Sequence, residues 1–483
     1  MADGKGNDAG ANAAEKTKPT LALVAESVKG CADCLHEKLA GSGAELIYFP
    51  TLVDLDCLQR DLIRPLSQAS PEQLNSLLSG APYRTATDLK SCAKSIMDGA
   101  AAVFAGQDVY LFDAPKSTGR KIEQSETETI ITGPHDGFVE ALEENLGVIR
   151  KRIRSPKLKS VALEVGEVAK TRAILLYVEG LANEQFVTML TDRIQDIEID
   201  GVSDANMLVQ LIDENPNSLF PQYLTTERPD AVVSKLLGGR IAVILDGSPS
   251  VFSAPTAFLE FFSSPDDYYQ RWPIGTALRI LRLIGFLITI CFTAFYVSVT
   301  TFHYEMIPHT MLLNLAESRS RVPFPPLIEA LLMETTIELL REAGARLPTK
   351  IGQTIGIVGG IVIGQAAVQA GFTSNILIIA VAISAIASFV IPSYIMSASL
   401  RLIRFGLIVL AGILGNLGLI FGIGFLVVHM AGVTNLGTSY LTPIAPAKFM
   451  DILDTLVRGP FWALKKRPSL SRSPNKTRAK IKR

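Results

Sequence analysis

The chain has 483 residues and a formal net charge of −1 at pH 7, so its overall charge does not indicate a nucleic-acid partner. Hydrophobic residues make up 48% of the sequence, and almost all of the apolar excess falls after residue 280, which excludes a wholly soluble protein. The length suits about three domains. We therefore expect a soluble first half and a membrane-embedded second half.

Residues 1–20 are polar and rich in alanine, glycine and lysine, which predicts a disordered N-terminus without a signal peptide. Five cysteines follow, an odd number, so no disulfide framework is implied. Cys31 and Cys34 could hold a metal or form a redox pair, but no second ligand cluster follows them in the sequence. We favour ordinary packing for both, and expect no metal and no cofactor.

The soluble half is predicted to contain two subdomains, residues 21–125 and 126–265. In the first, the short apolar runs 100–106 and 109–112 flank a turn-type sequence and predict a β-hairpin. In the second, strand and helix signals alternate, so the predicted fold class is α/β. The sequence contains no phosphate loop, metalloprotease motif or nucleophile elbow, and we therefore do not expect an enzyme.

Residues 266–445 are predicted to form an α-helical, multi-span transmembrane domain. Its first apolar stretch carries no charge over 20 residues, enough to cross a hydrocarbon core of about 30 Å. Pro392 should kink the third span, and Asn416 should bond to a neighbouring helix from within the fourth. The predicted spans are residues 283–302, 351–372, 376–400 and 405–430.

Glycines recur every four residues in the second predicted span, a spacing that lets another helix approach closely in lipid. Gln365 and Gln369 fall on nearly the opposite side of the same helix. Amides at membrane depth face protein or water, so these two side chains either bond to a neighbouring helix or line a water-filled pathway. The predicted packing glycines are Gly352, Gly356, Gly360 and Gly364.

An amphipathic helix is predicted over residues 327–343, just before the glycine-rich span, and it carries Glu329, Glu334 and Glu338. The helix could lie at the membrane surface with its carboxylates in water. If several copies surround an axis, the carboxylates could instead form rings that attract cations. A third possibility is that Glu338 pairs with Arg341 or Arg346 and serves only the fold.

Residues 446–483 form a strongly basic tail, with 11 Lys and Arg against two Asp from residue 448 onward. We predict that this tail is disordered and lies near anionic lipid on the cytoplasmic side. Four spans would place the soluble half on that side as well. Basic residues between the first and second spans oppose this orientation.

Long stretches of the chain are similar to the A subunit of the GerA family of spore germinant receptors, over roughly residues 120–445. The resemblance is carried by extended and specific motifs. They are PFPPLIEALLMETTIELLREAGARLP (323–348), GQTIGIVGGIVIGQAAVQAG (352–371), GPHDGFVEALEENLGVIRKRI (133–153), LLGGRIAVILDGSP (236–249) and SPDDYYQRW (264–272).

The resemblance implies a nutrient germinant receptor subunit in the inner membrane of bacterial endospores. Such subunits are held to form an oligomeric, nutrient-gated cation channel that triggers germination. The implied partners are a permease-like B subunit, a lipoprotein C subunit, further copies of the chain and membrane lipid, with the N-terminal region and the tail on the core side. Two alternatives stay open: a non-conducting scaffold for a germination complex, and an A-type partner of the dipicolinate-release channel.

Overall fold

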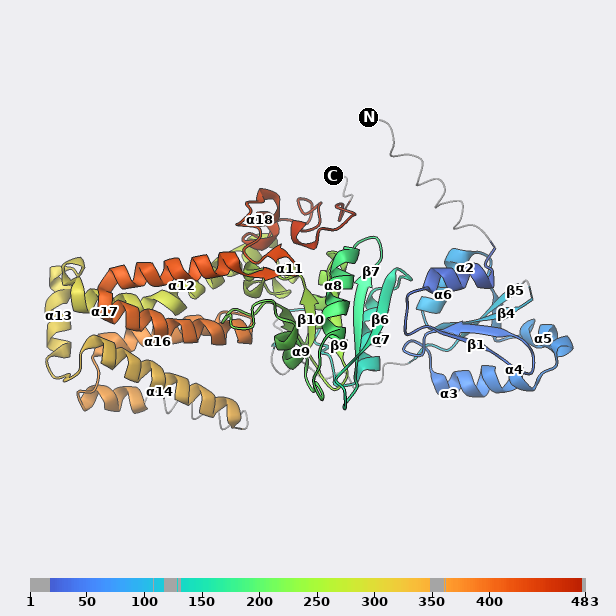
Figure 1. Cartoon of the computed structure of the whole chain (residues 1–483), viewed down its shortest axis with the longest axis horizontal. Helices are drawn as coiled ribbons and strands as arrows, with labels where there is room; N and C mark the ends of the chain where they lie inside the picture. The colour runs from blue at the N-terminus through green and yellow to red at the C-terminus, as the bar shows by residue number, and fades with distance from the viewer. Residues whose placement is uncertain are drawn as a thin grey trace, which may run out of the picture. The chain divides into compact units, whose positions relative to one another are not determined.

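The computed structural model describes residues 18–106, 108–116, 128, 132–347, 360 and 362–479. The chain divides into two compact units (Figure 1). The first comprises residues 1–213, 223–256 and 464–483, and the second comprises residues 214–222 and 257–463. Most of the predicted disordered N-terminus, residues 1–17, lies outside the described residues.

The first subdomain is a five-stranded antiparallel sheet in the order β1-β2-β4-β5-β3, with helices on both faces. Central strand β4 is buried along its whole length, because α2 and α6 cover one face while α3, α4 and α5 cover the other. The predicted hairpin is confirmed, since β4 pairs with β5 across Gly106. The elements are α2 (Leu21–Val28), β1 (Leu35–Lys38), β2 (Glu45–Tyr48), α3 (Leu55–Leu58), α4 (Arg64–Gln68), α5 (Pro71–Leu78), β3 (Tyr83–Thr85), α6 (Leu89–Met97), β4 (Ala100–Ala105) and β5 (Asp108–Asp113).

The second subdomain holds another five-stranded sheet, in the order β6-β7-β9-β10-β8. Strands and helices alternate as predicted, but every pairing in both sheets is antiparallel. Apolar side chains of α7 and α10 build its core against β9, and α8 packs on β6 and β7. The elements are α7 (Leu142–Arg152), β6 (Leu158–Val165), β7 (Thr171–Val178), α8 (Glu184–Gln195), α9 (Ala205–Ile212), β8 (Leu224–Thr226), α10 (Pro229–Leu237), β9 (Ile241–Leu245) and β10 (Val251–Ala254).

A buried ion pair joins the two subdomains. Arg150 on α7 is fully buried and bonds the carboxylate of Asp33, which lies just before β1. The same carboxylate accepts a hydrogen bond of 2.6 Å from the Ser160 hydroxyl on β6, and the Arg150 guanidinium lies 4.4 Å from the centre of the Phe49 ring. A charge this deep needs its partner, so Arg150 and Asp33 tie one sheet to the other.

Cys31 and Cys34 lie beside this joint. Cys31 is buried and its thiol donates to the carbonyl oxygen of Leu158 at 3.4 Å. Burial raises the pKa of the Cys34 thiol to about 12, which disfavours the reactive thiolate. Within the described part of the chain, no group of three or more His, Cys, Asp or Glu side chains could hold a metal ion.

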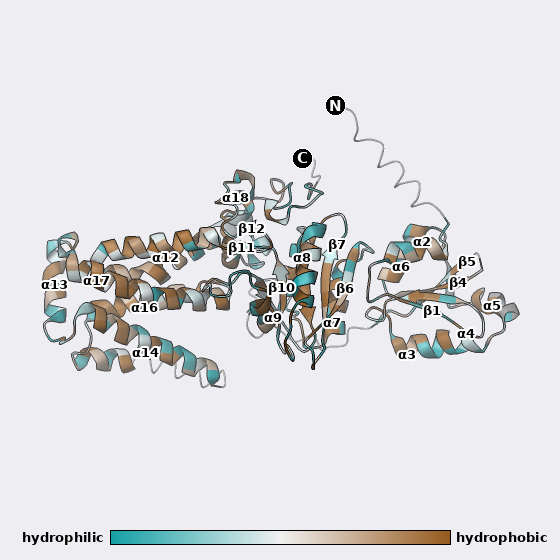
Figure 2. Ribbon diagram, in the orientation of Figure 1, coloured by the Kyte–Doolittle hydropathy of each residue, from teal (hydrophilic) through white to brown (hydrophobic). Residues whose placement is uncertain are grey.

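The second unit is a bundle of apolar helices (Figure 2). Among the described residues, α12 and α17 are the two helices long and apolar enough to cross a membrane, and α16 is apolar but shorter. Helix α14 covers the segment predicted to be amphipathic. The elements are α11 (Asp266–Tyr269), α12 (Trp272–Phe302), α13 (His309–Arg319), α14 (Pro326–Arg346), α16 (Asn375–Phe389), α17 (Tyr394–Gly432), β11 (Thr434–Asn435), β12 (Thr438–Ser439) and α18 (Phe449–Thr455).

Helix α17 is folded back on itself at Gly415, whose φ of 63° and ψ of −144° suit glycine alone. A Cβ on Gly418 would lie 2.1 Å from the carbonyl oxygen of Leu410, and one on Gly422 would lie 2.4 Å from a methyl of Leu407. Contacts between residues eight and fifteen positions apart require two antiparallel helices. The segment is therefore a tight helical hairpin.

Polar groups from the end of α12 satisfy the backbone at this reversal. The Ser298 hydroxyl donates to the side-chain oxygen of Asn416 at 2.7 Å, and the Asn416 backbone N–H donates to the His303 ring at 3.3 Å. The predicted bond from Asn416 to a neighbouring helix is confirmed. Asn416 lies at a turn, however, and not inside a continuous span.

Two predicted spans therefore have the wrong boundaries. Residues 376–400 are not one helix, because α16 ends at Phe389 and α17 begins at Tyr394, with Pro392 between them. Proline has no N–H for the helical ladder, so the chain breaks there instead of bending. Residues 405–430 are divided by the reversal at Gly415.

The tail also differs from its prediction. Residues 446–483 are not uniformly disordered: α18 is helical, Lys466 pairs with Thr477 in a β-bridge, and Leu470 is buried. The Arg467 side chain donates to the Leu237 carbonyl oxygen at 3.0 Å. Apolar residues interspersed among the cations anchor the segment, which a count of charges does not reveal. Residues 480–483 lie outside the described part.

We expect Gly418→Ala to prevent the α17 hairpin from closing, because the new methyl would collide with backbone that cannot move aside. Overpacking of this kind costs about 1–3 kcal/mol or more. Gly424→Ala is the matched control, since a Cβ there meets nothing within 4 Å. Thermal melting of the two variants in detergent, followed by size-exclusion fluorescence, measures the difference. Equal melting temperatures would contradict the tight hairpin.

Candidate functional site

The acidic residues predicted as a pathway lie on α14, a helix that begins with Pro326 in its first turn and ends at Arg346. This helix packs against α12, α16 and α17 of the bundle. Glu329 and Glu334 are fully buried, and Glu338 is 34% exposed. Their surroundings decide whether these carboxylates are available to ions.

Glu334 forms an ion pair inside the bundle. One carboxylate oxygen lies 2.7 Å from the guanidinium of Arg404 on α17, and neither side chain is exposed. The other oxygen accepts a hydrogen bond of 2.8 Å from the Thr293 hydroxyl on α12. Arg404 also donates to the Ser384 hydroxyl on α16 at 2.9 Å. Four helices thus converge on one buried charge pair.

Glu338 lies one helical turn further along α14 and repeats the arrangement. Arg401 of α17 donates to its carboxylate at 2.9 Å, and Arg341 lies 3.9 Å from it on the same helix. Arg401 also bonds the Ser397 hydroxyl at 3.1 Å, and Arg341 bonds the Ser388 hydroxyl at 3.1 Å. Two arginines therefore face this carboxylate.

Glu329 is held differently, at the beginning of α16. Its carboxylate accepts hydrogen bonds from the backbone N–H of Ser374 at 2.5 Å and from the Thr373 hydroxyl at 3.1 Å. Ser374 is the N-cap of α16, so the carboxylate lies at the positive end of a helix dipole. Arg319 lies 3.9 Å away.

All three predicted glutamates are thus partnered within the chain, and none presents a free carboxylate. Of the alternative pairings considered for Glu338, the contact with Arg341 is present, whereas Arg346 bonds Glu342 instead, at 2.6 Å. Glu334–Arg404 and Glu338–Arg401 are the two bundle ion pairs.

Sequence reasoning missed both arginines of the bundle ion pairs. Arg401 and Arg404 fell between two predicted spans, where a basic residue is unremarkable. The structure places them three residues apart on one face of α17. The spacing Arg-Leu-Ile-Arg within an apolar helix was the available signal, since arginines at membrane depth face the bundle interior and pair.

The predicted glycine and glutamine residues lie elsewhere. Residues 362–369 are helical, and Gln365 and Gln369 are exposed. A Cβ on Gly360 or Gly364 would meet nothing within 4 Å, so neither glycine makes a close helix contact with the described residues. The other two predicted packing glycines, at positions 352 and 356, lie outside the described residues.

The whole arrangement can be compared with known proteins. The model of the Bacillus/Clostridium GerA spore germination protein family matches residues 22–470, which is most of the chain and includes both units. The chain belongs to the GerA family. The resemblance seen in the sequence motifs is therefore confirmed, and it extends well beyond the 120–445 range where those motifs lie.

Relatives from the family cover nearly the full length. Spore germination protein GerQA of Bacillus cereus is 40% identical over 459 residues, covering 93% of this chain and 92% of the relative. Spore germination protein KA of Bacillus subtilis (strain 168) is 39% identical over 443 residues, covering 90% and 81%. These GerA relatives are named for germination and not for a catalysed reaction.

A solved structure of the N-terminal domain of the A subunit of the Bacillus megaterium spore germinant receptor GerK3 is also similar. It is 26% identical and covers 49% of this chain and 94% of that domain, with a TM-score of 0.38.

Proposed function

We propose that this GerA-family chain is the A subunit of a nutrient germinant receptor and forms, with further copies of itself, a nutrient-gated path for monovalent cations. The proposal rests on one observation: two ion pairs, Glu334–Arg404 and Glu338–Arg401, lie inside an apolar helical bundle. Charged groups at membrane depth are costly, and where they occur they commonly serve ion movement. A passive anchor has no need of them.

In this proposal the bundle ion pairs keep the path closed. Each pair neutralises a carboxylate of α14 with an arginine of α17, so the bundle offers cations no free negative charge at these positions. Opening would move α14 relative to α17 and expose Glu334 and Glu338. Copies arranged around an axis would then present rings of carboxylates.

The exposed amides of Gln365 and Gln369 complete the proposed path, because their helix follows α14 in the chain and is uncovered in the single subunit. The glycines Gly352, Gly356, Gly360 and Gly364 would pack against a neighbouring copy. We place the assembly in the inner membrane of the endospore, with permease-like B and lipoprotein C subunits. The N-terminal region and the tail would face the core.

Spores lacking the gene test the proposal against its alternatives. We expect deletion to abolish nutrient-triggered release of monovalent cations for one class of nutrient, and the intact gene to restore it. If cations leave normally while dipicolinate is retained, the chain serves the dipicolinate channel. If neither release changes for any nutrient that triggers the parent spores, the receptor function is contradicted.

We expect Glu338→Gln to lower the preference for cations over anions while leaving assembly intact. The side chain is 34% exposed, and an amide oxygen can still accept the hydrogen bond from Arg401, so the fold should tolerate the change. Glu342→Gln is the matched control: it lies four residues along α14 and pairs with Arg346 on the exposed face. Reversal potentials in asymmetric KCl report the preference. Equal values for the two variants would remove Glu338 from the path.

A further inference from the structure

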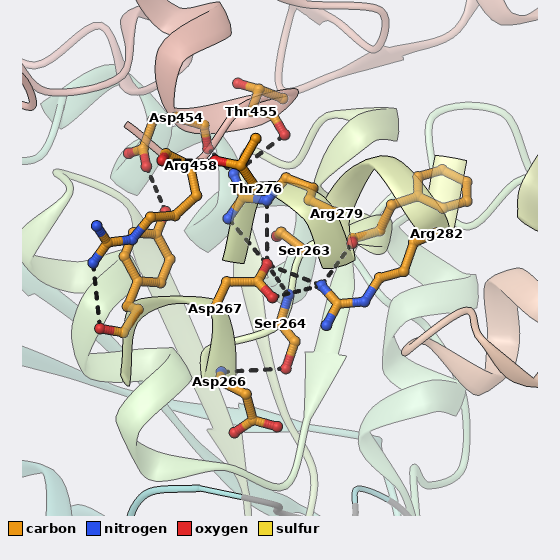
Figure 3. Close-up of polar contacts among 12 residues, drawn as sticks. Ser263, Ser264, Asp266, Asp267, Thr276, Arg279, Arg282, Asp454, Thr455 and Arg458 are labelled. Carbon is orange, nitrogen blue, oxygen red and sulfur yellow. Dashed lines mark hydrogen bonds and ion pairs between the residues drawn. The ribbon is translucent and has the colours of Figure 1, made fainter. Parts of the chain in front are cut away.

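A second buried cluster of charges lies where the first apolar helix begins (Figure 3). Asp267, in α11, is fully buried and accepts hydrogen bonds from two arginines of α12. Arg279 donates to it from Nε at 3.2 Å and Arg282 at 2.8 Å. Arg282 also donates to the carbonyl oxygen of Phe262 at 3.4 Å. The cluster fixes the first turns of α12 to the segment before it.

The same cluster holds the C-terminal segment against α12. Arg279 donates to the backbone oxygen of Asp454 in α18 at 2.7 Å, and the Thr276 hydroxyl donates to the backbone oxygen of Arg458 at 3.0 Å (Figure 3). The Tyr268 phenol donates to the Asp454 carboxylate, and burial raises the pKa of this phenol, which therefore stays a donor. Helix α18 and residues 456–462 are thereby fixed beside the beginning of α12.

The outer side of this segment is apolar and aromatic. Phe449 is 79% exposed and Met450 is 59% exposed, both on α18, and Phe461 and Trp462 follow at 55% and 47%. Large apolar side chains this exposed need a cover. Two exposed cations lie where these helices begin: Lys448 directly precedes α18, and Arg271 directly precedes α12.

The length of α12 indicates at which depth of a membrane this surface lies. Its 31 residues extend about 46 Å at ~1.5 Å per residue, close to the ~40–45 Å of a bilayer with both headgroup layers. If α12 spans the membrane, its first turns lie in one headgroup layer. Because hydrogen bonds hold α18 to those turns, α18 lies in the same layer. Tryptophan and phenylalanine next to cations suit that environment.

We propose that α18 and residues 456–462 form an interfacial membrane-binding element that lies in the headgroup layer of an anionic bilayer. Phe449, Met450, Phe461 and Trp462 enter the boundary between headgroups and acyl chains, and Lys448 and Arg271 contact lipid phosphates. The inference rests on the membrane placement in the proposed function and adds a lipid contact that is not a span. The element would fix the depth and rotation of α12.

The chain contains only two tryptophans, Trp272 and Trp462, which permits a direct test on the full-length protein. Trp272→Phe leaves Trp462 as the sole tryptophan, and Trp462→Phe leaves Trp272. Each variant is reconstituted in vesicles that contain phosphatidylglycerol. Its tryptophan fluorescence is then quenched in separate samples by iodide in the water and by lipids brominated at shallow or deep acyl positions. A water-exposed reference replaces both tryptophans by phenylalanine and adds Val168→Trp in the soluble unit, at a site that is 77% exposed.

We expect Trp462 to be quenched by shallow brominated lipid several-fold more than the Val168→Trp reference, and to be protected from iodide. Trp462 quenched by iodide as strongly as the reference, while Trp272 is quenched by shallow lipid, would overturn the interfacial element and leave the spanning of α12 intact. Trp462 shielded from both quenchers would also overturn it, because protein would then cover the surface. Both tryptophans in water would contradict the membrane placement itself.

Vesicles of different lipid composition test whether the cations contribute to lipid binding. We expect Lys448→Glu to reduce shallow-lipid quenching of Trp462 in vesicles with phosphatidylglycerol, and to have less effect in pure phosphatidylcholine. Asp451 lies in the first turn of the same helix, three residues after Lys448, so the effect of one lysine should be partial. An identical effect of Lys448→Glu in both kinds of vesicle would overturn the preference for anionic lipid.

Discussion

Glu334→Gln should remove most of the folded protein, and adding Arg404→Met should restore a large part of it. The single change leaves Arg404 charged and fully buried without its partner. Removing one partner from a buried pair costs about 3–5 kcal/mol, whereas replacing both with uncharged groups is often neutral or stabilising. If Glu334 served only to attract cations, the substitution would leave assembly intact. The contact with Arg404 reverses that expectation.

The matched control is the exposed pair Glu342–Arg346 on the same helix, whose side chains are 57% and 79% exposed. Its double variant, Glu342→Gln with Arg346→Met, should change stability by less than about 1 kcal/mol. Yield and melting temperature of monodisperse protein in detergent measure both comparisons. A Glu334→Gln protein that melts like the parent, or a double variant no better than the single, would show that the buried pair does not hold the bundle.

The second large effect concerns the joint between the two subdomains of the first unit. Arg150→Met should destabilise a fragment of residues 18–256 by about 3–5 kcal/mol, because Asp33 loses the guanidinium that neutralises it. For a fragment of this size that corresponds to a fall in melting temperature of roughly 6–20 °C. The fragment ends before Ala257, since residues 257–463 belong to the helical unit.

Arg154→Met is the control variant for Arg150→Met. Arg154 lies on the same stretch and pairs with Asp98 at 3.1 Å, but its side chain is 64% exposed. We expect its loss to cost less than about 1 kcal/mol. Circular dichroism melts of the two variants should therefore differ clearly. Equal melts, or a fragment that melts without cooperativity, would contradict a joint built on the buried pair.

Local patterns predicted the elements of the first unit well. The hairpin of β4 and β5 follows from two apolar runs around a glycine turn, and the alternation of strands and helices follows from their periodicity. The antiparallel order of the sheets was not predicted, because pairing depends on contacts between distant segments. The joint at Arg150 and Asp33 was missed for the same reason: its residues are 117 positions apart.

In the helical unit, hydropathy located the apolar segments but not their ends. Pro392 was expected to kink a helix, and it separates two. Gly415 was one glycine among many in an apolar stretch, and only the backbone conformation identifies it as a reversal. The glutamates of α14 were singled out from the sequence as candidates for an ion pathway. Their partners Arg401 and Arg404 were not singled out, because basic residues are ordinary in a loop between two spans. They become unusual only once the structure shows that α17 continues through them.

The most direct test of the central claim is current through the assembled receptor. The chain, reconstituted with its B and C subunits in a planar bilayer, should conduct when the nutrient is added, with a reversal potential near that of a monovalent cation in asymmetric KCl. Substitutions that stabilise the bundle ion pairs should keep it closed. A correctly assembled complex that stays silent with nutrient present would contradict the claim and favour a scaffold.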